Sequence, residues 1–203
     1  MIRIYPFIFI LLWSSAFITT KPIVDNSDPF AALAFRFFFV AVGFYLFSVY
    51  SNNSVLIKKK NLIESFLSGI LFHGFYLGGV FFSISIGMPA GIAALIVTLQ
   101  PILTNLLSGP ILNEKVSIKQ WIGAFLGFVG AALVLGFDLG SKIPLLGLIA
   151  TVIALIAITI STIWQKKLSN NLPLSVSNFY QAIGGCFFHT LIIIFFTEAI
   201  IDF

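Results

Sequence analysis

Residues 69–99 read GILFHGFYLGGVFFSISIGMPAGIAALIVTL and contain no Asp, Glu, Lys or Arg. A helix crosses the hydrocarbon core of a bilayer with about 20 apolar residues, so this stretch is too long for a single crossing. Gly87, Met88 and Pro89 interrupt it, and glycine and proline favour turns over helix interiors. The stretch therefore predicts two membrane helices, Leu62–Ile86 and Pro89–Leu112, joined by a tight hairpin at the membrane surface.

The rest of the chain has the same apolar character. Of its 203 residues, 59% are apolar and 9% are charged, whereas a soluble domain carries about 25% charged residues. This composition excludes a soluble domain and a disordered chain, and the long continuous apolar runs exclude a membrane barrel. We predict an all-α, polytopic transmembrane helical bundle of about seven helices. The five further apolar segments are Ile4–Thr20, Phe30–Tyr50, Gln120–Phe137, Pro144–Trp164 and Ser177–Ile200.

The basic residues are distributed unequally between the two ends of these segments. Connections on the N-terminal side of the membrane carry eight Lys or Arg residues, and those on the other side carry two, Lys21 and Lys142. Short loops rich in Lys and Arg stay in the cytoplasm. We therefore expect a cytoplasmic N-terminus and a cytoplasmic connection Ser51–Asn61, and seven crossings then place Phe203 outside.

Polar side chains gather on one face of the segment Pro89–Leu112. At 100° per residue, Gln100, Pro101 and Thr104 lie on the same side of a helix. Pro101 also removes a backbone donor near mid-bilayer and frees the carbonyl of Val97. Because lipid cannot satisfy these groups, the face meets either another helix, as a polar contact, or a substrate in a wet cavity.

The third segment places His73 and Tyr76 on one face, close to mid-bilayer. An intramembrane histidine can relay a proton near neutral pH, or can hydrogen-bond between helices as a neutral group. The rings of Tyr76 and Trp13 can stack on a substrate, or can serve as packing and lipid contacts. The sequence leaves both pairs of alternatives open.

Arg36 lies seven residues after Pro29, inside the second apolar segment. An arginine near the bilayer centre costs about 2.5–3.5 kcal/mol on insertion scales, and less where its side chain can reach the interface. We expect the guanidinium to reach the surface, to pair with Asp25 or Asp28, or to take part in substrate binding or gating.

The fifth segment carries Gly123, Gly127 and Gly130. Small residues at this spacing let two helix backbones approach each other closely. We therefore expect this face to pack against another helix and not to form a binding site.

A weak internal repeat relates Pro29-Phe30 to Pro173-Leu174 at an offset of 144 residues. A unit of five helices reverses its orientation when it is repeated, and inverted repeats are typical of secondary transporters. We predict a five-helix unit over residues 4–137, followed by the first two helices of a second unit over residues 144–203. This repeat makes Tyr180 or Gln181 the counterpart of Arg36.

Signatures of enzymes are absent from the sequence. It contains no His-Glu-x-x-His pair, glycine-rich phosphate loop or G-x-S-x-G elbow. Its single cysteine, Cys186, allows no intramolecular disulfide and suggests no metal cluster. We expect no enzymatic activity, no cofactor, no metal site and no nucleic-acid partner.

Two groups of residues are typical of one family. The first is LWSSAF at residues 12–17, followed by Pro29 and Arg36, and the second is AGIAALI at 90–96, LQP at 99–101 and QWIG at 120–123. Together they resemble the EamA-type proteins of the drug/metabolite transporter superfamily.

The resemblance implies a secondary transporter of the bacterial inner membrane that moves small metabolites or drugs by alternating access, often as an exporter. It also implies ten helices, in two inverted halves around a central cavity. The residues expected to bind substrate are Trp13, His73, Tyr76, Gln100 and Trp164, and those expected to form a gate or polar support are Arg36, Thr104 and Gln181.

The sequence departs from the family pattern by ending after seven helices. We expect either a truncated reading of a longer gene or a homodimer in which a second copy completes the pore. The alternative to a transporter is a non-transporting membrane fragment or interaction subunit, whose polar faces only hold helices together. Small-molecule substrate and membrane lipid are the expected binding partners.

Overall fold

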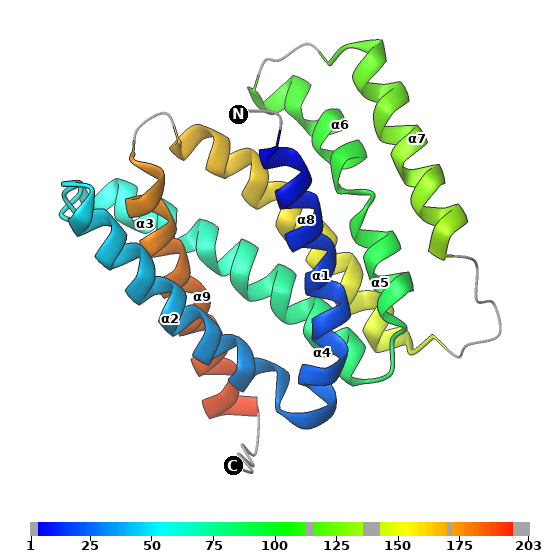
Figure 1. Ribbon diagram of the computed structural model, residues 1–203, viewed down its shortest axis with the longest axis horizontal. Coiled ribbons are helices and arrows are strands. Elements are labelled where there is room, and N and C mark those ends of the chain that lie inside the picture. The colour runs from blue at the N-terminus through cyan, green and yellow to red at the C-terminus, as the bar shows by residue number, and fades with distance from the viewer. Residues whose placement is uncertain (1–3, 113–115, 136–142, 170–171, 197–203) are drawn as a thin grey trace.

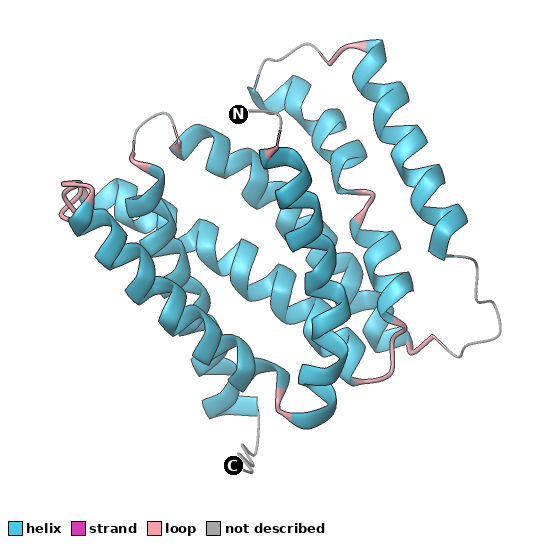
Figure 2. Cartoon of the chain, viewed as in Figure 1, coloured by secondary structure: helices cyan, strands magenta, loops and turns pink. Residues whose placement is uncertain are grey.

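The computed structural model of the chain describes residues 4–112, 116–135, 143–169 and 172–196, and these residues form helices and connecting loops (Figures 1 and 2). Within the described residues, each of the seven predicted apolar segments is largely helical, and the ends of two of them, residues 136–137 and 197–200, lie outside the described residues. The elements are α1 (Tyr5–Asn26), α2 (Pro29–Tyr50), α3 (Lys59–Gly69), a π-helix η1 (Ile70–Leu77), α4 (Gly78–Ser85), α5 (Ala90–Val97), α6 (Gln100–Leu112), α7 (Ile118–Leu135), α8 (Leu145–Leu168) and α9 (Leu174–Phe196).

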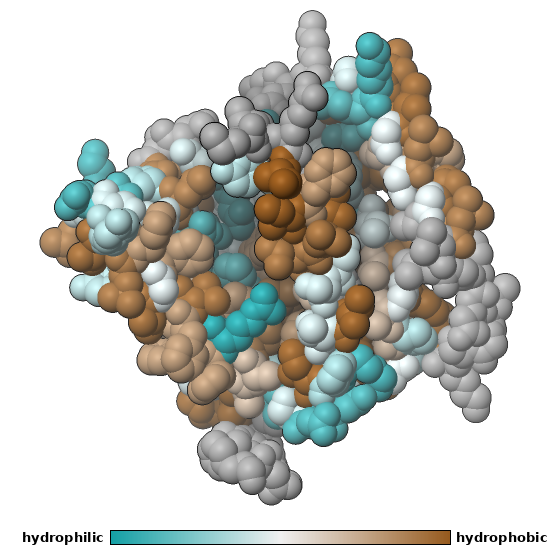
Figure 3. Space-filling view, in the orientation of Figure 1, coloured by the Kyte–Doolittle hydropathy of each residue, from teal (hydrophilic) through white to brown (hydrophobic). Residues whose placement is uncertain are grey.

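Five helical segments of the described chain are long and apolar enough to cross a membrane: Pro29–Tyr50, Lys59–Ser85, Ala90–Ile111, Leu145–Leu168 and Leu174–Phe196. The space-filling view accordingly shows broad brown areas on the visible face (Figure 3). The protein is therefore a multi-pass, all-α membrane protein. Membrane crossing by α1 and α7 stays a prediction.

Two short connections fix the directions of the helices that they join. The Asp28 carboxylate accepts hydrogen bonds from the backbone N–H groups of Phe30 and Ala31, at 2.9 and 2.8 Å, and so caps the N-terminus of α2. Gly87 has a φ of +96°, a conformation that glycine adopts without steric penalty. The backbone N–H of Met88 then donates to the backbone carbonyl of Ser83 at 2.9 Å. This bond confirms the predicted hairpin between α4 and α5.

Two of the membrane segments depart from regular α-helix. In the third, α3, η1 and α4 follow one another without interruption, and the π-helix η1 occupies the middle. In the fourth, the helix breaks between Val97 and Gln100. The break falls at Thr98 and Leu99, where Pro101 lacks the N–H that would bond the carbonyl of Val97 in a continuous helix.

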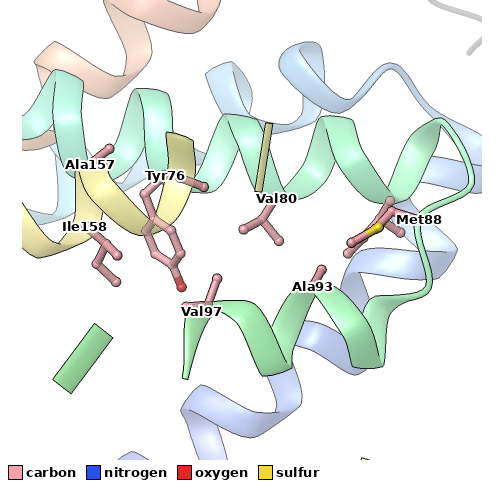
Figure 4. Close-up of a cluster of buried hydrophobic side chains, with 9 residues drawn as sticks. Tyr76, Val80, Met88, Ala93, Val97, Ala157 and Ile158 are labelled. Carbon is pink, nitrogen blue, oxygen red and sulfur yellow. The ribbon is translucent and has the colours of Figure 1, made fainter. Parts of the chain in front are cut away.

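Consecutive segments run in alternate directions across the bundle (Figure 1). The helix α9 packs along α2, α3 and η1, and α8 packs along η1 and α4, while α7 lies at one edge against α5 and α6. One cluster of buried side chains joins η1, α4, α5 and α8 (Figure 4). A second joins α2, α4 and α9 around Leu33, Phe37 and Phe81.

Glycines allow the closest helix contacts, but not on the helix for which this was predicted. A Cβ atom on Gly69 would clash with the backbone of Gln181, and one on Gly184 would clash with the backbone carbonyl of Phe66. By contrast, Gly123, Gly127 and Gly130 of α7 are exposed and have no neighbouring atom within 4 Å in the described chain. Within the described residues, the predicted packing face of α7 therefore contacts no other helix, because α7 contacts α5 and α6 through a different face.

Candidate functional site

A cavity of about 280 Å³ lies between α1, α2 and the η1–α4 segment. It brings together four residues that the sequence singled out: Trp13, Arg36, His73 and Tyr76. The visible face of the molecule is hollowed between α1 and α2 (Figure 3). The other residues that line the cavity are Leu12, Ala16, Thr20, Phe37, Val40, Phe72, Leu77, Val80 and Phe81.

Arg36 contributes a cation to the cavity and does not pair with the aspartates of the preceding loop. Asp25 accepts a hydrogen bond from Lys21 at 2.7 Å, and Asp28 caps α2. The expected pairing of Arg36 with either aspartate is therefore wrong. The guanidinium carbon instead lies 5.8 Å from the centroid of the Phe37 ring, within the range of a cation–π contact.

His73 is carried into the cavity by the π-helix η1. Its ring lies against Phe37, with centroids 4.4 Å apart, and its Nδ1 atom is buried with no hydrogen-bond partner. A π-helix is rare and often marks a functional site. The fully buried His189 of α9 holds this turn, because its Nε2–H donates to the backbone carbonyl of His73 at 2.9 Å.

The sequence analysis did not place His189 of α9 beside His73. Both imidazole rings lie near Phe37, at centroid distances of 4.4 and 6.0 Å. The available signal for His189 was the adjacent pair Gly184-Gly185 in the same helix. Gly185 lets α9 come so close to η1 that a Cβ atom there would lie 2.5 Å from the Cβ of His73.

Tyr76 lies at the boundary between the cavity and the hydrophobic core. The residue is 3% exposed and belongs to the core cluster of η1, α4, α5 and α8. Its ring projects from η1 toward Val97 on α5 (Figure 4). Tyr76 therefore forms a wall of the cavity and separates it from the core.

The structure places Gln100, Thr104 and Trp164 away from this cavity. The Gln100 amide donates to Thr104 at 3.1 Å and to Thr162 of α8 at 3.4 Å. These bonds favour the interpretation of the polar face of α6 as a helix–helix contact. Trp164 is half-buried on α8 and does not line the cavity.

Gln181 belongs to a second polar region, which we call the polar seam, between α3, α8 and α9. The Gln165 amide donates to Gln181 at 2.9 Å, and the Gln181 amide donates to Ser177 at 2.9 Å. Two hydroxyl pairs join the same three helices, Ser65 with Ser177 at 3.5 Å and Ser68 with Ser161 at 3.1 Å. The seam therefore consists of Ser65, Ser68, Ser161, Gln165, Ser177 and Gln181.

The polar seam leaves no room for a ligand between its helices. Its four serines and Gln181 are between 0 and 3% exposed. The backbones approach most closely at Gly69 and Gly184, directly beside the seam. Sequence reasoning missed Gln165 and the serines, because single serines in apolar helices carry no signal of their partners.

A second, apolar cavity of about 470 Å³ lies between α2 and α9. Its lining carries aromatic and aliphatic side chains, the half-buried thiol of Cys186 and the hydroxyl of Thr190. None of the residues described as lining it carries a formal charge, whereas Arg36 lines the first cavity. The other lining residues are Phe38, Ala41, Val42, Tyr45, Phe179, Ile183 and Phe187.

Comparison with known proteins matches this chain to membrane transporters. The profile of the EamA-like transporter family matches residues 3–136. An "Uncharacterized transporter" of Archaeoglobus fulgidus is 26% identical over 87% of this chain and 62% of its own length. A "Probable amino-acid metabolite efflux pump" of Escherichia coli is 26% identical over 80% of this chain and 52% of its own length. The chain thus spans about half the length of the curated relatives that it matches.

Proposed function

The chain belongs to the EamA-like transporter family of the drug/metabolite transporter superfamily, and from this premise we propose that it moves small metabolites or drugs across the bacterial inner membrane. The observation that carries this proposal is the cavity that joins Trp13, Arg36, His73 and Tyr76 inside an apolar bundle. A concave site with a few convergent polar groups in apolar walls is typical of small-molecule binding.

The mechanism that we propose is secondary active transport by alternating access, with export as its direction. The cavity would hold the solute, and the polar seam would keep one side of the membrane closed while the cavity is loaded. Hydrogen bonds between uncharged side chains suit such a gate, since each contributes only about 0.6 kcal/mol in a membrane protein and can be exchanged.

The arrangement of the chain in the membrane is part of the proposal. We place the N-terminus and Ser51–Asn61 in the cytoplasm and Phe203 outside, in line with the positive-inside rule. We further propose that the chain forms a homodimer. A periplasm-active reporter fused after Phe203 should be active, and the same reporter inserted within Ser51–Asn61 should be silent.

Flux measurements test the function directly. The purified full chain is reconstituted into sealed vesicles that contain a panel of labelled amino acids, other small metabolites and drugs, with and without a proton gradient. We expect release of at least one solute at a rate at least tenfold above that of protein-free vesicles.

Two matched variants distinguish the binding site from a structural contact. His73→Ala removes a group that lines the cavity, and Gln100→Ala removes a group that bonds between α6 and α8. We expect His73→Ala to lower flux with the folded fraction unchanged, and Gln100→Ala to lower mainly thermal stability. Folded, vesicle-inserted chain that moves no solute would instead support the interaction subunit.

A further inference from the structure

Arg36 presents a permanent positive charge inside a membrane-spanning helix. It lies seven residues after the start of α2 at Pro29, which corresponds to a depth of about 10 Å at 1.5 Å per residue. Charged side chains within membrane helices are costly, and they face partners, water-filled cavities or substrates. Arg36 faces the cavity between α1, α2 and η1–α4.

No carboxylate in the described part of the chain neutralises this charge. The described acidic residues are occupied elsewhere: Asp25 pairs with Lys21, Asp28 caps α2, and Glu64 lies 3.9 Å from Lys60. The contact that the structure gives to the guanidinium is the ring of Phe37. The charge therefore remains available to an anion that enters the cavity.

The remaining walls of the cavity suit an apolar body attached to that anion. Among the residues described as lining it, Arg36 is the one with a formal charge. Trp13 of α1 and Phe37 of α2 present aromatic rings, and Val40 and Leu77 add aliphatic surface. A volume of about 280 Å³ holds a single small molecule and not a large one.

We propose that the cavity selects small monoanions, in which a carboxylate binds the Arg36 guanidinium and an apolar or aromatic body lies against Trp13 and Phe37. The planar guanidinium offers two parallel N–H donors that match the two oxygens of a carboxylate. A second negative charge on the solute would find no cation on these walls and would lose its hydration without compensation. This inference rests on the proposed function, since it names the chemical class of its solutes.

A matched pair of probes tests the inference on the wild-type walls of the cavity. Phenylacetate and phenylacetamide have nearly the same shape, and only the first carries a charge. Trp121→Phe and Trp164→Phe together leave Trp13 as the single tryptophan, and its fluorescence in the full chain, held in lipid nanodiscs, reports occupancy of the cavity. We expect phenylacetate to bind at least tenfold more tightly than phenylacetamide, and phenyl phosphate to bind more weakly than phenylacetate.

Variants of Arg36 assign the discrimination to its side chain. Arg36→Gln should abolish the difference in affinity between phenylacetate and phenylacetamide. Arg36→Lys should keep part of that difference, because an ammonium retains the positive charge but lacks the two parallel N–H donors of a guanidinium. Lys21→Gln is the matched control, since Lys21 is a cation of α1 that pairs with Asp25 outside the cavity, and it should change neither affinity. If Arg36→Gln fails to fold, the affinities of the Trp121→Phe, Trp164→Phe chain for phenylacetate and phenylacetamide still decide whether the cavity selects the anion.

Equal affinity for acid and amide would overturn the inference, and so would discrimination that persists in folded Arg36→Gln. Neither result would touch the proposed transport function, which the flux measurement decides independently. Conversely, selective binding of phenylacetate by a chain that moves no solute would leave this inference intact and overturn transport.

Discussion

The polar seam and the cavity place polar groups inside the same bundle in opposite ways. In the seam, Gln165 and Gln181 bond to each other and each bonds to a serine. In the cavity, the Arg36 guanidinium has no carboxylate partner in the described chain, and His73 Nδ1 has no hydrogen bond.

This difference separates groups that hold the fold from groups that are available to a ligand. A buried polar group with partners contributes to stability, whereas one without partners lowers it. The seam should therefore respond to substitution through folding, and the cavity should respond through binding.

Gly184→Leu should cause the largest loss, because the new side chain would begin against the backbone carbonyl of Phe66 beside the seam. Overpacking costs about 1–3 kcal/mol, and more where the obstacle is backbone. We expect most of the folded, monodisperse protein to be lost on size-exclusion chromatography. Gly127→Leu on α7 is the control, since nothing lies within 4 Å of Gly127, and comparable loss there would contradict the assignment of close contacts.

Trp13→Ala should lower solute flux about tenfold, equivalent to about 1.4 kcal/mol, because it removes an aromatic wall of the cavity. The matched control is Trp121→Ala on α7, since the two residues are similarly exposed, at 37% and 36%, and only Trp13 lines the cavity. Flux in proteoliposomes and thermal stability are measured for both. Equal losses of flux in the two variants would remove the cavity from the transport path.

Gln181→Ala should lower the free energy of unfolding by about 1 kcal/mol, because it breaks the bonds to Gln165 and Ser177. Thermal unfolding in detergent, followed by circular dichroism, measures the change. Probe affinity at Trp13 should stay within twofold of the wild-type value, since Gln181 lies outside the cavity. A stability equal to that of wild type would show that the seam is not a structural contact.

Ser48→Ala should have the smallest effect, within about 0.5 kcal/mol of the wild-type free energy of unfolding. The Ser48 hydroxyl is fully buried and has no hydrogen-bond partner, so its removal leaves no other group unpaired. Ser68→Ala, which breaks the pair with Ser161, should be more destabilising. The reverse order in thermal unfolding would contradict the partner assignments of both serines.

Much of the architecture could be predicted from the sequence because hydrophobic run length and turn residues act locally. The run from Leu62 to Leu112 with Gly87 in its middle predicted both helices and the hairpin between them. The sequence also singled out Trp13 and His73 as candidate substrate-binding residues. Their meeting in one cavity depends on packing and is visible only in the structure.

The predictions that the structure corrects concern which partner a residue contacts, and spacing along the sequence does not determine that partner. Asp25 was near enough to Arg36 in sequence to pair with it, but Lys21, four residues before Asp25 on the same helix, takes the carboxylate instead. The glycines of α7 have the spacing of a close-packing face and those of α9 are merely adjacent, yet of these two helices α9 is the one with another described helix close against its glycines. The seam joins serines 93 and 112 residues apart, and nothing local marks such pairs.

The wide turn of η1 has a geometric consequence for the whole third segment. A π-helix bonds each carbonyl to the fifth residue onward, so it holds more residues per turn than the α-helices on either side. The rotational phase of α4 is thereby uncoupled from that of α3, and Ser68 can point at α8 while Ile84 points into the core. Deletion of a single residue between Ile70 and Leu77 would swing every later side chain of the segment around the helix axis, and the walls of the cavity with them.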